Sequence, residues 1–476
     1  MLDWKEGDYY SKDRVERTIR NLLSLGVFTS VTIDTTDFRD SIIDYAILTN
    51  YRNQQEFYLE PGANQTQNYF YNIFLNLIYS NKNILGGAQG FSAATSILNR
   101  DVEDFLKTKN RGFFNYLDDF VDEVSLNLSY SDPYIFKVND AFLGLSSNPV
   151  LSIRRIDNFF NLNTILLPIN FPIKFKTNLD LKSFAFFINI ERQQPSGFDE
   201  FVNSKNDEAD FDRVFQSLIL YNDLNNYFKQ SGNYVSSVSL GARAIRDKRN
   251  NPFMPTYGHL INGEVEYAFA GLTKYFRLLA TWTTYNSLSK YEVLGTKLKF
   301  GGFYFLEEGN RYASLDKQFF AGGANSVRGW DSRKLRYTNA KLNDVDANSR
   351  RLLENFVGNA MIFETSFEYR LKFKEPDINL GALNEHISSM GLTMFLDIGN
   401  SYGWLLGGND FNFTDIFTKL AYSAGAGLTY ETPVGPLRLD LAMPIYGPIG
   451  YKYEGIWNTK DLMSNLNWHV GLGYSF

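Results

Sequence analysis

Apolar and polar residues alternate along residues 361–373, in the C-terminal half of the chain. One face of this segment would carry Met361, Phe363, Phe367, Tyr369, Leu371 and Phe373. The other face would carry Glu364, Ser366, Glu368, Arg370 and Lys372. A period of two predicts a β-strand, and so charged a face suits the wet lumen of a β-barrel whose outer face meets lipid. A slip of one residue would turn the charges into lipid, so the register is strongly specified.

The same alternation recurs from about residue 53 to the C-terminus, for example in residues 437–445 and 467–476. The predicted strands begin near residues 53, 69, 88, 120, 134, 164, 181, 233, 259, 274, 295, 359, 391, 421, 436 and 466. We therefore predict a mostly β fold in which residues 53–476 form an antiparallel transmembrane β-barrel of about 16 strands, because closure satisfies every strand edge in lipid. The alternative, a soluble β-sandwich or propeller, would not readily collect this many charges on one strand face.

Composition narrows the possible functions. Aromatic residues make up 16% of the chain, which suits the interfacial girdles of an outer-membrane barrel. The chain has no cysteine, so disulfides and thiolate metal sites are excluded. Its net charge of −6 argues against nucleic acid as a partner. Residues 344–348 begin like a calcium loop but lack its glycine and final glutamate. We found no nucleotide, zinc or serine-hydrolase motif, so we predict no enzyme activity, no cofactor and no metal.

The N-terminal 52 residues follow a different pattern. Residues 11–25 have helical periodicity, carried by Val15, Ile19, Leu22 and Leu23. Gly26 is placed to end this helix, and strands are predicted at residues 27–33 and 42–49. This order resembles the second half of a POTRA domain, so residues 1–52 are interpreted as a partial last POTRA domain in the periplasm. No apolar signal segment opens the chain, and we interpret the sequence as a fragment of an exported protein.

A glycine-rich segment with a single arginine separates two predicted strands. It reads Phe319-Phe320-Ala321-Gly322-Gly323-Ala324-Asn325-Ser326-Val327-Arg328-Gly329-Trp330. This segment resembles the F-x-G-G-x-x-x-V-R-G-[FYW] loop of the BamA/TamA outer-membrane assembly family. The last position is more often Phe or Tyr in that family. The resemblance implies that the loop folds back into the barrel lumen, and the alternative is an ordinary solvated loop arginine.

The same resemblance implies partners for Arg328. The stretch Phe395-Leu396-Asp397-Ile398-Gly399 resembles the F-x-D-x-G strand of the family, which places Asp397 on the inward face. Glu368 is expected to face inward from the neighbouring strand. A buried arginine needs such carboxylates, ideally in a bidentate pair. The site predicted for this loop therefore comprises Arg328, Gly329, Gly322, Gly323, Val327, Trp330, Asp397 and Glu368.

The C-terminal strand is the second candidate site. It ends in Phe476 and carries aromatic residues at alternate positions. In the BamA/TamA family the first and last strands meet at a seam that can open laterally, and glycines would weaken strand pairing there. The residues predicted for this seam are Trp468, Gly471, Gly473, Tyr474 and Phe476. A closing strand with no special role is compatible with the same residues.

These resemblances imply an outer-membrane assembly factor, TamA-like more than BamA-like, that inserts β-barrel proteins through the seam. Its partners would be nascent outer-membrane β-barrel polypeptides, a bilayer containing lipopolysaccharide, and accessory lipoproteins or an inner-membrane TamB-like protein. The location would be the Gram-negative outer membrane, with the N-terminal part in the periplasm. The alternatives are a two-partner-secretion-type polypeptide exporter and, from another class, a passive porin or surface adhesin.

Overall fold

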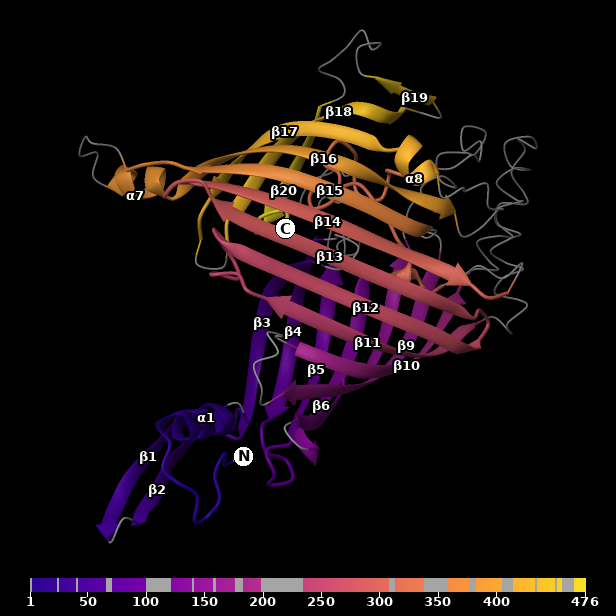
Figure 1. The fold of residues 1–476 in the computed structure, drawn as a ribbon. Coiled ribbons are helices and arrows are strands. Elements are labelled where there is room, and N and C mark those ends of the chain that lie inside the picture. Colours follow the sequence, from indigo (N-terminus) through magenta and orange to yellow (C-terminus); the bar gives the residue numbers. More distant parts are fainter. Residues whose placement is uncertain are drawn as a thin grey trace.

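A closed antiparallel β-barrel dominates the chain (Figure 1). The computed structural model describes residues 2–23, 25–39, 42–65, 71–99, 121–138, 141–156, 160–175, 183–197, 234–307, 313–337, 358–375, 382–404, 414–432, 435–449, 452–455 and 466–476. The barrel strands are β3 (Gln55–Gln65), β4 (Tyr71–Asn81), β5 (Gly90–Asn99), β6 (Glu123–Val138), β7 (Ala141–Ser147), β8 (Val150–Ile156), β9 (Phe160–Phe175), β10 (Ser183–Ser196), β11 (Val235–Asp247), β12 (Gly258–Gly271), β13 (Tyr275–Ser287), β14 (Glu292–Phe305), β15 (Asn359–Lys372), β16 (Met390–Trp404), β17 (Ala421–Tyr430), β18 (Leu437–Ile449), β19 (Lys452–Gly455) and β20 (Asn467–Leu472).

The number of strand positions around the barrel agrees with the number of strands predicted from the sequence. Strands β7 and β8 follow each other in the chain and lie between the same two neighbours, β6 and β9, so they act as one interrupted strand. Strand β19 pairs with the far end of β18, beside the stretch that pairs with β20, so β19 and β20 share one position next to β18. Counting β7 with β8 and β19 with β20 reduces the eighteen described barrel strands to sixteen positions. The predicted barrel is confirmed.

Strand β15, whose alternating sequence led to the barrel prediction, has its polar face toward the lumen. In β15 the side chains of Glu364 and Glu368 are 1% and 0% exposed, whereas Phe367 is 44% exposed. This is the reverse of a soluble protein, where the apolar face is the buried one. The register places Ser366 opposite Asp397 of β16, which brings the predicted partners of Arg328 onto adjacent strands.

Two predicted strand boundaries were wrong. Residue 134 lies within β6, because the strand continues past Pro133 through a register shift between Asp132 and Phe136. The last strand does not reach Phe476. It ends at Leu472, and Gly473 has φ 85°, a left-handed backbone that leaves the strand direction. The predicted starts near residues 69, 120, 181 and 233, and the calcium-like residues 344–348, lie outside the described ranges.

A small α/β unit lies beyond one end of the barrel (Figure 1). It consists of α1 (Lys12–Leu23) and the antiparallel pair β1 (Phe28–Arg39) and β2 (Ile42–Tyr51). The predicted helix and both predicted strands are therefore present, with β1 longer than expected. Its interpretation as part of a POTRA domain stays a prediction. Two further short helices are described, α7 (Ala382–Ser388) and α8 (Asp415–Thr418). Across the described ranges, no helix has the length and apolar character needed to cross a bilayer.

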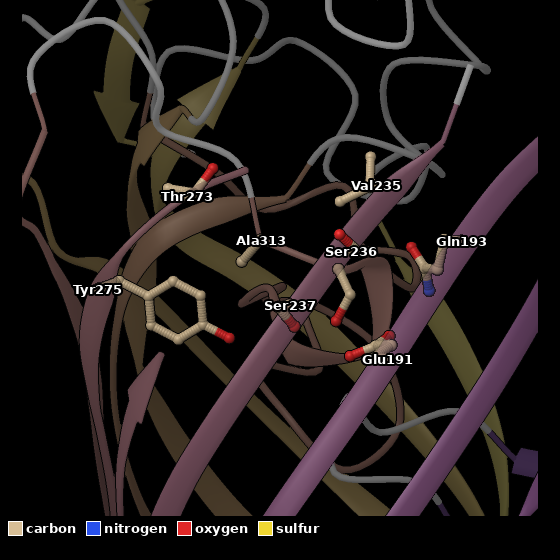
Figure 2. A pocket seen from close by; sticks show the side chains of 9 residues that line it. Glu191, Gln193, Val235, Ser236, Ser237, Thr273, Tyr275 and Ala313 are labelled. Atoms are coloured by element: carbon tan, nitrogen blue, oxygen red, sulfur yellow. The ribbon is translucent and has the colours of Figure 1, made fainter. Parts of the chain in front are cut away.

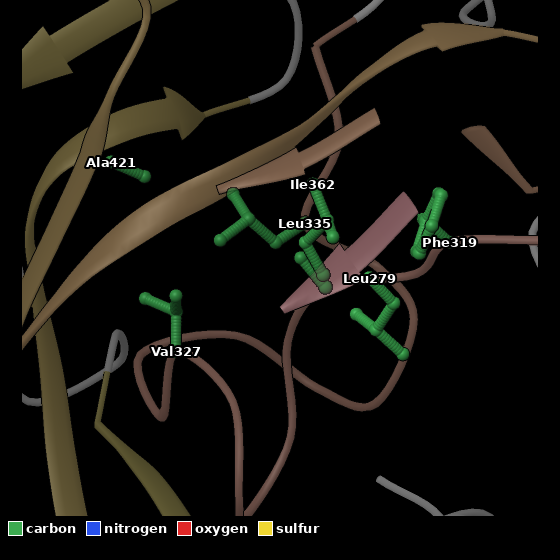
Figure 3. Packing of buried hydrophobic residues seen from close by; sticks show 7 residues of the cluster. Leu279, Phe319, Val327, Leu335, Ile362 and Ala421 are labelled. Carbon is green, nitrogen blue, oxygen red and sulfur yellow. The ribbon is translucent and has the colours of Figure 1, made fainter. Parts of the chain in front are cut away.

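The segment between β14 and β15 fills part of the lumen. Its residues 313–337, called the lumen loop below, include the short 3-10 helix η2 (Leu315–Lys317). An apolar cluster fixes the loop to the inner wall (Figure 3). The members of the cluster are Leu279, Phe319, Ala321, Val327, Leu335, Ile362 and Ala421, of which Leu279, Ile362 and Ala421 come from β13, β15 and β17. The predicted path of the loop, back into the lumen, is the path observed.

Candidate functional site

The lumen loop makes its sharpest turn at Gly322 and Gly323. Their φ angles are 97° and 103°, a region that other residues rarely adopt. The turn is closed by a hydrogen bond from the Gly323 N–H to the Trp330 carbonyl, 2.9 Å, so residues 323–330 form a compact hairpin-like tip. Val327, which is 1% exposed, packs into the apolar cluster and directs the next residue toward the wall. These glycines therefore set the direction in which Arg328 projects.

Arg328 is fully buried and surrounded by carboxylates. Its Nε and Nη2 atoms lie 2.7 and 2.9 Å from the two oxygens of Asp397, a bidentate pair. Its Nη1 donates to Glu368 at 3.0 Å and to Asp440 at 3.3 Å. The guanidinium also lies 3.3 Å from the centre of the Phe395 ring, where a cation–π attraction is favourable. The structure thus brings together Arg328, Asp397 and Glu368, the three charged residues that the sequence assigned to this site.

The network around Arg328 balances three arginines against three carboxylates. Arg370 Nε donates to Glu368 at 2.7 Å, and Arg438 Nε lies 2.8 Å from Asp440. Arg438 also donates to the Ala324 carbonyl at 2.7 Å and therefore holds the loop backbone directly. The sequence missed Asp440 and Arg438 as members of the site. Their signal was present, since both lie in the alternating segment that became β18, but alternation does not reveal which wall the loop tip will meet.

The charge on Arg328 is strongly held. Burial on its own lowers the pKa of a guanidinium. The neighbouring carboxylates of Asp397, Glu368 and Asp440 outweigh it and raise the pKa of Arg328 above its ordinary value. The ion pairs therefore persist at every pH at which the carboxylates stay ionised.

The closing strand β20 contacts the loop tip through two side chains. The Asn467 amide donates to the Gly329 carbonyl at 2.6 Å, and a ring nitrogen of His469 bonds the Arg328 carbonyl. Both side chains face the lumen from alternate positions of the strand. Lys297 of β14 also donates a 2.9 Å hydrogen bond to the Asn325 carbonyl of the loop. The loop tip therefore contacts β14, β15, β16, β18 and β20.

The last four residues turn into the same network rather than continuing the strand. Ser475 donates to Glu368 at 3.0 Å, and Arg370 donates to the Phe476 carbonyl at 3.2 Å. Arg370 also lies over the Tyr474 ring, 3.7 Å from its centre. The Phe476 ring faces Tyr285 on the inner wall, with centroids 6.3 Å apart. Two predicted seam residues, Tyr474 and Phe476, are therefore part of the loop site.

The other predicted seam residues stay in or beside the strand. Trp468 is 39% exposed and faces outward from β20. Gly471 lies opposite Arg438 of β18. Gly473 donates its N–H to the Pro436 carbonyl at 2.7 Å, just past the end of the strand. These positions adjoin the closure of the barrel, where β20 is the neighbour of β3.

Trp330 lies at the outer end of β18. Its indole N–H points to the Pro448 carbonyl at 3.4 Å. Its ring covers Gly447 so closely that a methyl group there would come within 2.5 Å of Trp330 Cζ2. The tryptophan therefore uses both its ring and its N–H, and phenylalanine at this position would keep only the ring contact.

The arrangement is suited to holding a loop. No cluster of three or more His, Cys, Asp or Glu side chains within the described ranges is arranged to hold a metal ion. Each carboxylate of the network faces at least one arginine. What the arrangement can do is fix the loop tip, β18, β20 and the C-terminus relative to the β15–β16 wall.

Comparison with known proteins gives a family model and a curated relative. The model of the Omp85 superfamily domain matches residues 83–476. The outer membrane protein assembly factor BamA of Nitratidesulfovibrio vulgaris is 25% identical over 231 residues, which is 48% of this chain and 25% of that protein. The match thus spans about a quarter of the length of this curated relative.

Two solved structures resemble the chain to different degrees. BamA from Haemophilus ducreyi lacking POTRA domains 1–3 superimposes with a TM-score of 0.62 at 16% identity, covering 95% of this chain and 79% of that one. CdiB from Acinetobacter baumannii gives a TM-score of 0.48 at 13% identity, covering 99% and 70%. Because the sequence identity is low, the BamA structure supports the barrel fold of this chain and nothing about its function. The similarity to CdiB is too weak to support a conclusion.

Proposed function

The chain belongs to the Omp85 superfamily of outer-membrane β-barrel proteins, and we propose that it inserts and folds other β-barrel proteins in the outer membrane, using β20 as the movable strand. The BamA of Nitratidesulfovibrio vulgaris, which the chain resembles, is an outer membrane protein assembly factor. The finer proposal, insertion through a seam between β3 and β20, is supported by the way β20 is held.

The observation that carries the proposal is the shortness of the closing strand. Strand β20 has 6 residues, whereas β18 beside it has 13 and β15 has 14. Its register with β18 covers only Leu437 to Ala442. Because β20 has 6 residues, its pairing with its other neighbour, β3, is also short, and few backbone hydrogen bonds must break before β20 moves away from β3.

A short strand at the closure offers an edge to an incoming chain. A nascent strand in lipid carries unsatisfied N–H and C=O groups, each costing several kcal/mol, so about ten such groups oppose insertion strongly. Pairing with an exposed edge satisfies these groups one residue at a time, as in β-augmentation. The reaction needs no covalent step, cofactor or nucleotide, and we accordingly propose no enzyme activity.

The N-terminal unit would then lie in the periplasm and meet incoming polypeptides. The β1–β2 pair presents exposed apolar residues, of which Ile42 is 65% and Leu48 is 58% exposed. A two-stranded sheet has two unpaired edges, which suit either a client strand or an accessory protein. Accessory lipoproteins and a TamB-like inner-membrane protein remain the proposed additional partners.

Reconstitution tests the proposal directly. The purified chain in liposomes is mixed with a urea-denatured eight-stranded barrel protein, and folding is followed by heat-modifiable gel mobility. We expect the folding rate to rise at least about tenfold over liposomes that hold the same amount of a porin, which is a barrier difference of ~1.4 kcal/mol. Equal rates in the two liposome preparations would refute insertase activity.

A depletion experiment separates the alternatives in cells. Loss of several outer-membrane barrels after depletion supports the insertase. Normal barrel levels with the loss of one secreted polypeptide would instead identify an exporter. Normal levels of both, with lower permeability to small solutes, would identify a porin.

A further inference from the structure

The base of the lumen loop has an ionic cluster of its own, separate from Arg328. Lys317 Nζ lies 2.5 Å from Glu266 Oε1 of β12 and 3.6 Å from Glu191 Oε2 of β10. It also donates to the Tyr275 hydroxyl of β13 at 3.3 Å. Glu266 and Glu191 are 3% and 5% exposed, so this lysine pairs with two carboxylates that are almost fully buried.

Further contacts fix the backbone at the same place. Arg277 of β13 donates to the Lys317 carbonyl at 3.2 Å and to Glu264 at 2.7 Å. Leu315 N–H points to the Gln193 side-chain oxygen at 3.5 Å. Asp316 lies 3.6 Å from Arg154 of β8. The wall side is itself ordered, because Ser239 of β11 donates to Glu266 at 2.5 Å.

The two clusters lie on different arcs of the barrel. The loop base contacts β8, β10, β12 and β13, whereas the loop tip contacts β14, β15, β16, β18 and β20. In the strand order these contacts fall on two successive stretches of the wall. The Gln318 side chain and the Phe319 backbone, which lie between base and tip, bond Gly358 and Asn359 at the start of β15. One loop therefore contacts the wall between β8 and β20 through two separate sets of polar side chains.

We propose that Lys317 is a second positioning residue of the lumen loop, and that it holds the loop base to the β10–β12 wall independently of the Arg328 cluster. The inference goes beyond the proposed function, since it concerns how the loop is held and applies equally to an inserting or an exporting barrel. It follows that release of the tip at the seam does not release the base, and the loop swings on a fixed end rather than leaving the lumen as a whole.

The electrostatics at Lys317 support a strong hold. Burial alone lowers the pKa of a lysine, but Glu191, Tyr275 and Glu266 raise the pKa of Lys317 above its ordinary value. A neutral side chain at this position would take the cation away from both Glu191 and Glu266 and leave Glu266 with the Ser239 hydroxyl as its hydrogen-bond donor. Breaking a buried pair in this way is strongly destabilising.

A small polar cavity that opens to solvent lies beside the base (Figure 2). The empty space at this site is about 270 Å³ with the adjoining solvent included, and Glu191, Gln193, Thr273, Tyr275 and Ser314 are among its lining residues. Figure 2 shows the Glu191 and Gln193 side chains on one strand and Tyr275 across from them. Water entering this polar cavity can solvate Glu191 once Lys317 is removed, so the base can open locally while the barrel stays closed.

Single cysteines report on each end of the loop, because the chain contains no cysteine of its own. Ser314→Cys reports on the base and Ala324→Cys on the tip, at positions that are 6% and 1% exposed. Each reporter is combined with Lys317→Met or with Arg328→Met in the full chain in detergent. The rate of labelling by a water-soluble thiol reagent is then measured.

Each variant is expected to expose one reporter and not the other. Lys317→Met should speed labelling at Ser314→Cys by about tenfold or more and leave Ala324→Cys within about twofold, because local opening exposes only the released end. Arg328→Met should do the reverse. The conservative Lys317→Arg, which keeps the charge, should restore protection of Ser314→Cys.

Two results would overturn the proposal. If Lys317→Met accelerates both reporters together, the loop is one unit with a single hold. If it accelerates neither, Lys317 does not hold the base. Heat-modifiable mobility shows that each variant is folded, and Glu266→Gln, which keeps the shape of the side chain, replaces Lys317→Met if that variant does not fold.

Discussion

Two strand pairs that both contact the lumen loop are held in opposite ways. Strands β15 and β16 pair along their whole length, from Asn359 opposite Trp404 to Lys372 opposite Gly391. Strand β20 has only 6 residues, and its ladder with β18 runs from Asn467 to Leu472. On its other side β20 neighbours β3, two of its side chains reach the loop tip, and the four residues after it end against Glu368 and Arg370.

The difference teaches where the barrel can move. The long β15–β16 ladder has many backbone hydrogen bonds, so many must break before this wall opens. The β18–β20 ladder is short, so the side chains that reach the loop tip make a larger share of what holds β20. Changing those side chains, or a ligand that competes for them, can therefore release this strand. The Arg328 network then acts on β20 through the loop, and each of the following variants tests one part of that dependence.

The largest effect is expected from Asp397→Asn. It leaves the Arg328 guanidinium without its bidentate partner in a site that water does not reach, so the free energy of unfolding should fall by about 3 kcal/mol or more. The midpoint of heat-modifiable unfolding measures this change. Glu431→Gln is the matched control, since its pair with Lys372 at 2.5 Å is partly exposed and should contribute at most about 1 kcal/mol. If the two variants lowered the unfolding midpoint equally, the buried Arg328–Asp397 pair would be no more important than an exposed ion pair.

The next effect concerns the side chains of β20. The double variant Asn467→Ala, His469→Ala removes both bonds to the loop backbone and leaves two buried carbonyls unpaired, at a cost of about 2–3 kcal/mol. Labelling of a cysteine at Ala324 should rise in this variant because the loop tip loses its support on β20. Val470→Ala, on the outer face of the same strand, is the control and should leave labelling unchanged. No change in the double variant would mean that β20 does not support the tip.

A smaller effect is expected from Ser475→Ala. It removes the 3.0 Å hydrogen bond to Glu368 but leaves that carboxylate paired with Arg328 and Arg370, so the loss should be about 1.5 kcal/mol. Carboxypeptidase digestion should then remove Phe476 faster, because the C-terminus is less firmly held in the lumen. A digestion rate equal to that of the unchanged chain would contradict a role for this bond.

The smallest effect is expected from Trp330→Phe. The ring contact with Gly447 remains, and only the long 3.4 Å bond to the Pro448 carbonyl is lost, which amounts to about 0.5–1 kcal/mol. Trp330→Ala, which also removes the ring, should cost several times more. If Phe is as damaging as Ala, the indole N–H contributes more than its length indicates.

The sequence was sufficient for the barrel and for the first partners of the loop. Alternation in residues 361–373 gave the strand, its register and the inward position of Glu368, because period 2 admits only two ways to place a strand between lipid and water. Asp397 came from its resemblance to a family strand, and the structure places it against Arg328.

The rest depended on distances that the sequence does not contain. Asp440 and His469 showed inward positions by alternation, but which inward residues meet the loop tip depends on how the strands tilt around the barrel. The early end of β20 was missed because the alternation continues to Phe476, whereas the left-handed backbone at Gly473 stops the strand. Lys317 belonged to no motif. Its partners Glu266 and Glu191 are more than fifty residues away in the sequence, and only the closure of the barrel brings them together.

Amide hydrogen exchange on the chain in lipid nanodiscs, read by mass spectrometry, tests the central claim that the loop tip holds β20. In the Asp397→Asn variant the account requires faster exchange in residues 467–472, while residues 359–372 of the paired wall keep the protection that they have in the unchanged chain. Faster exchange in both segments, or in neither, would contradict it.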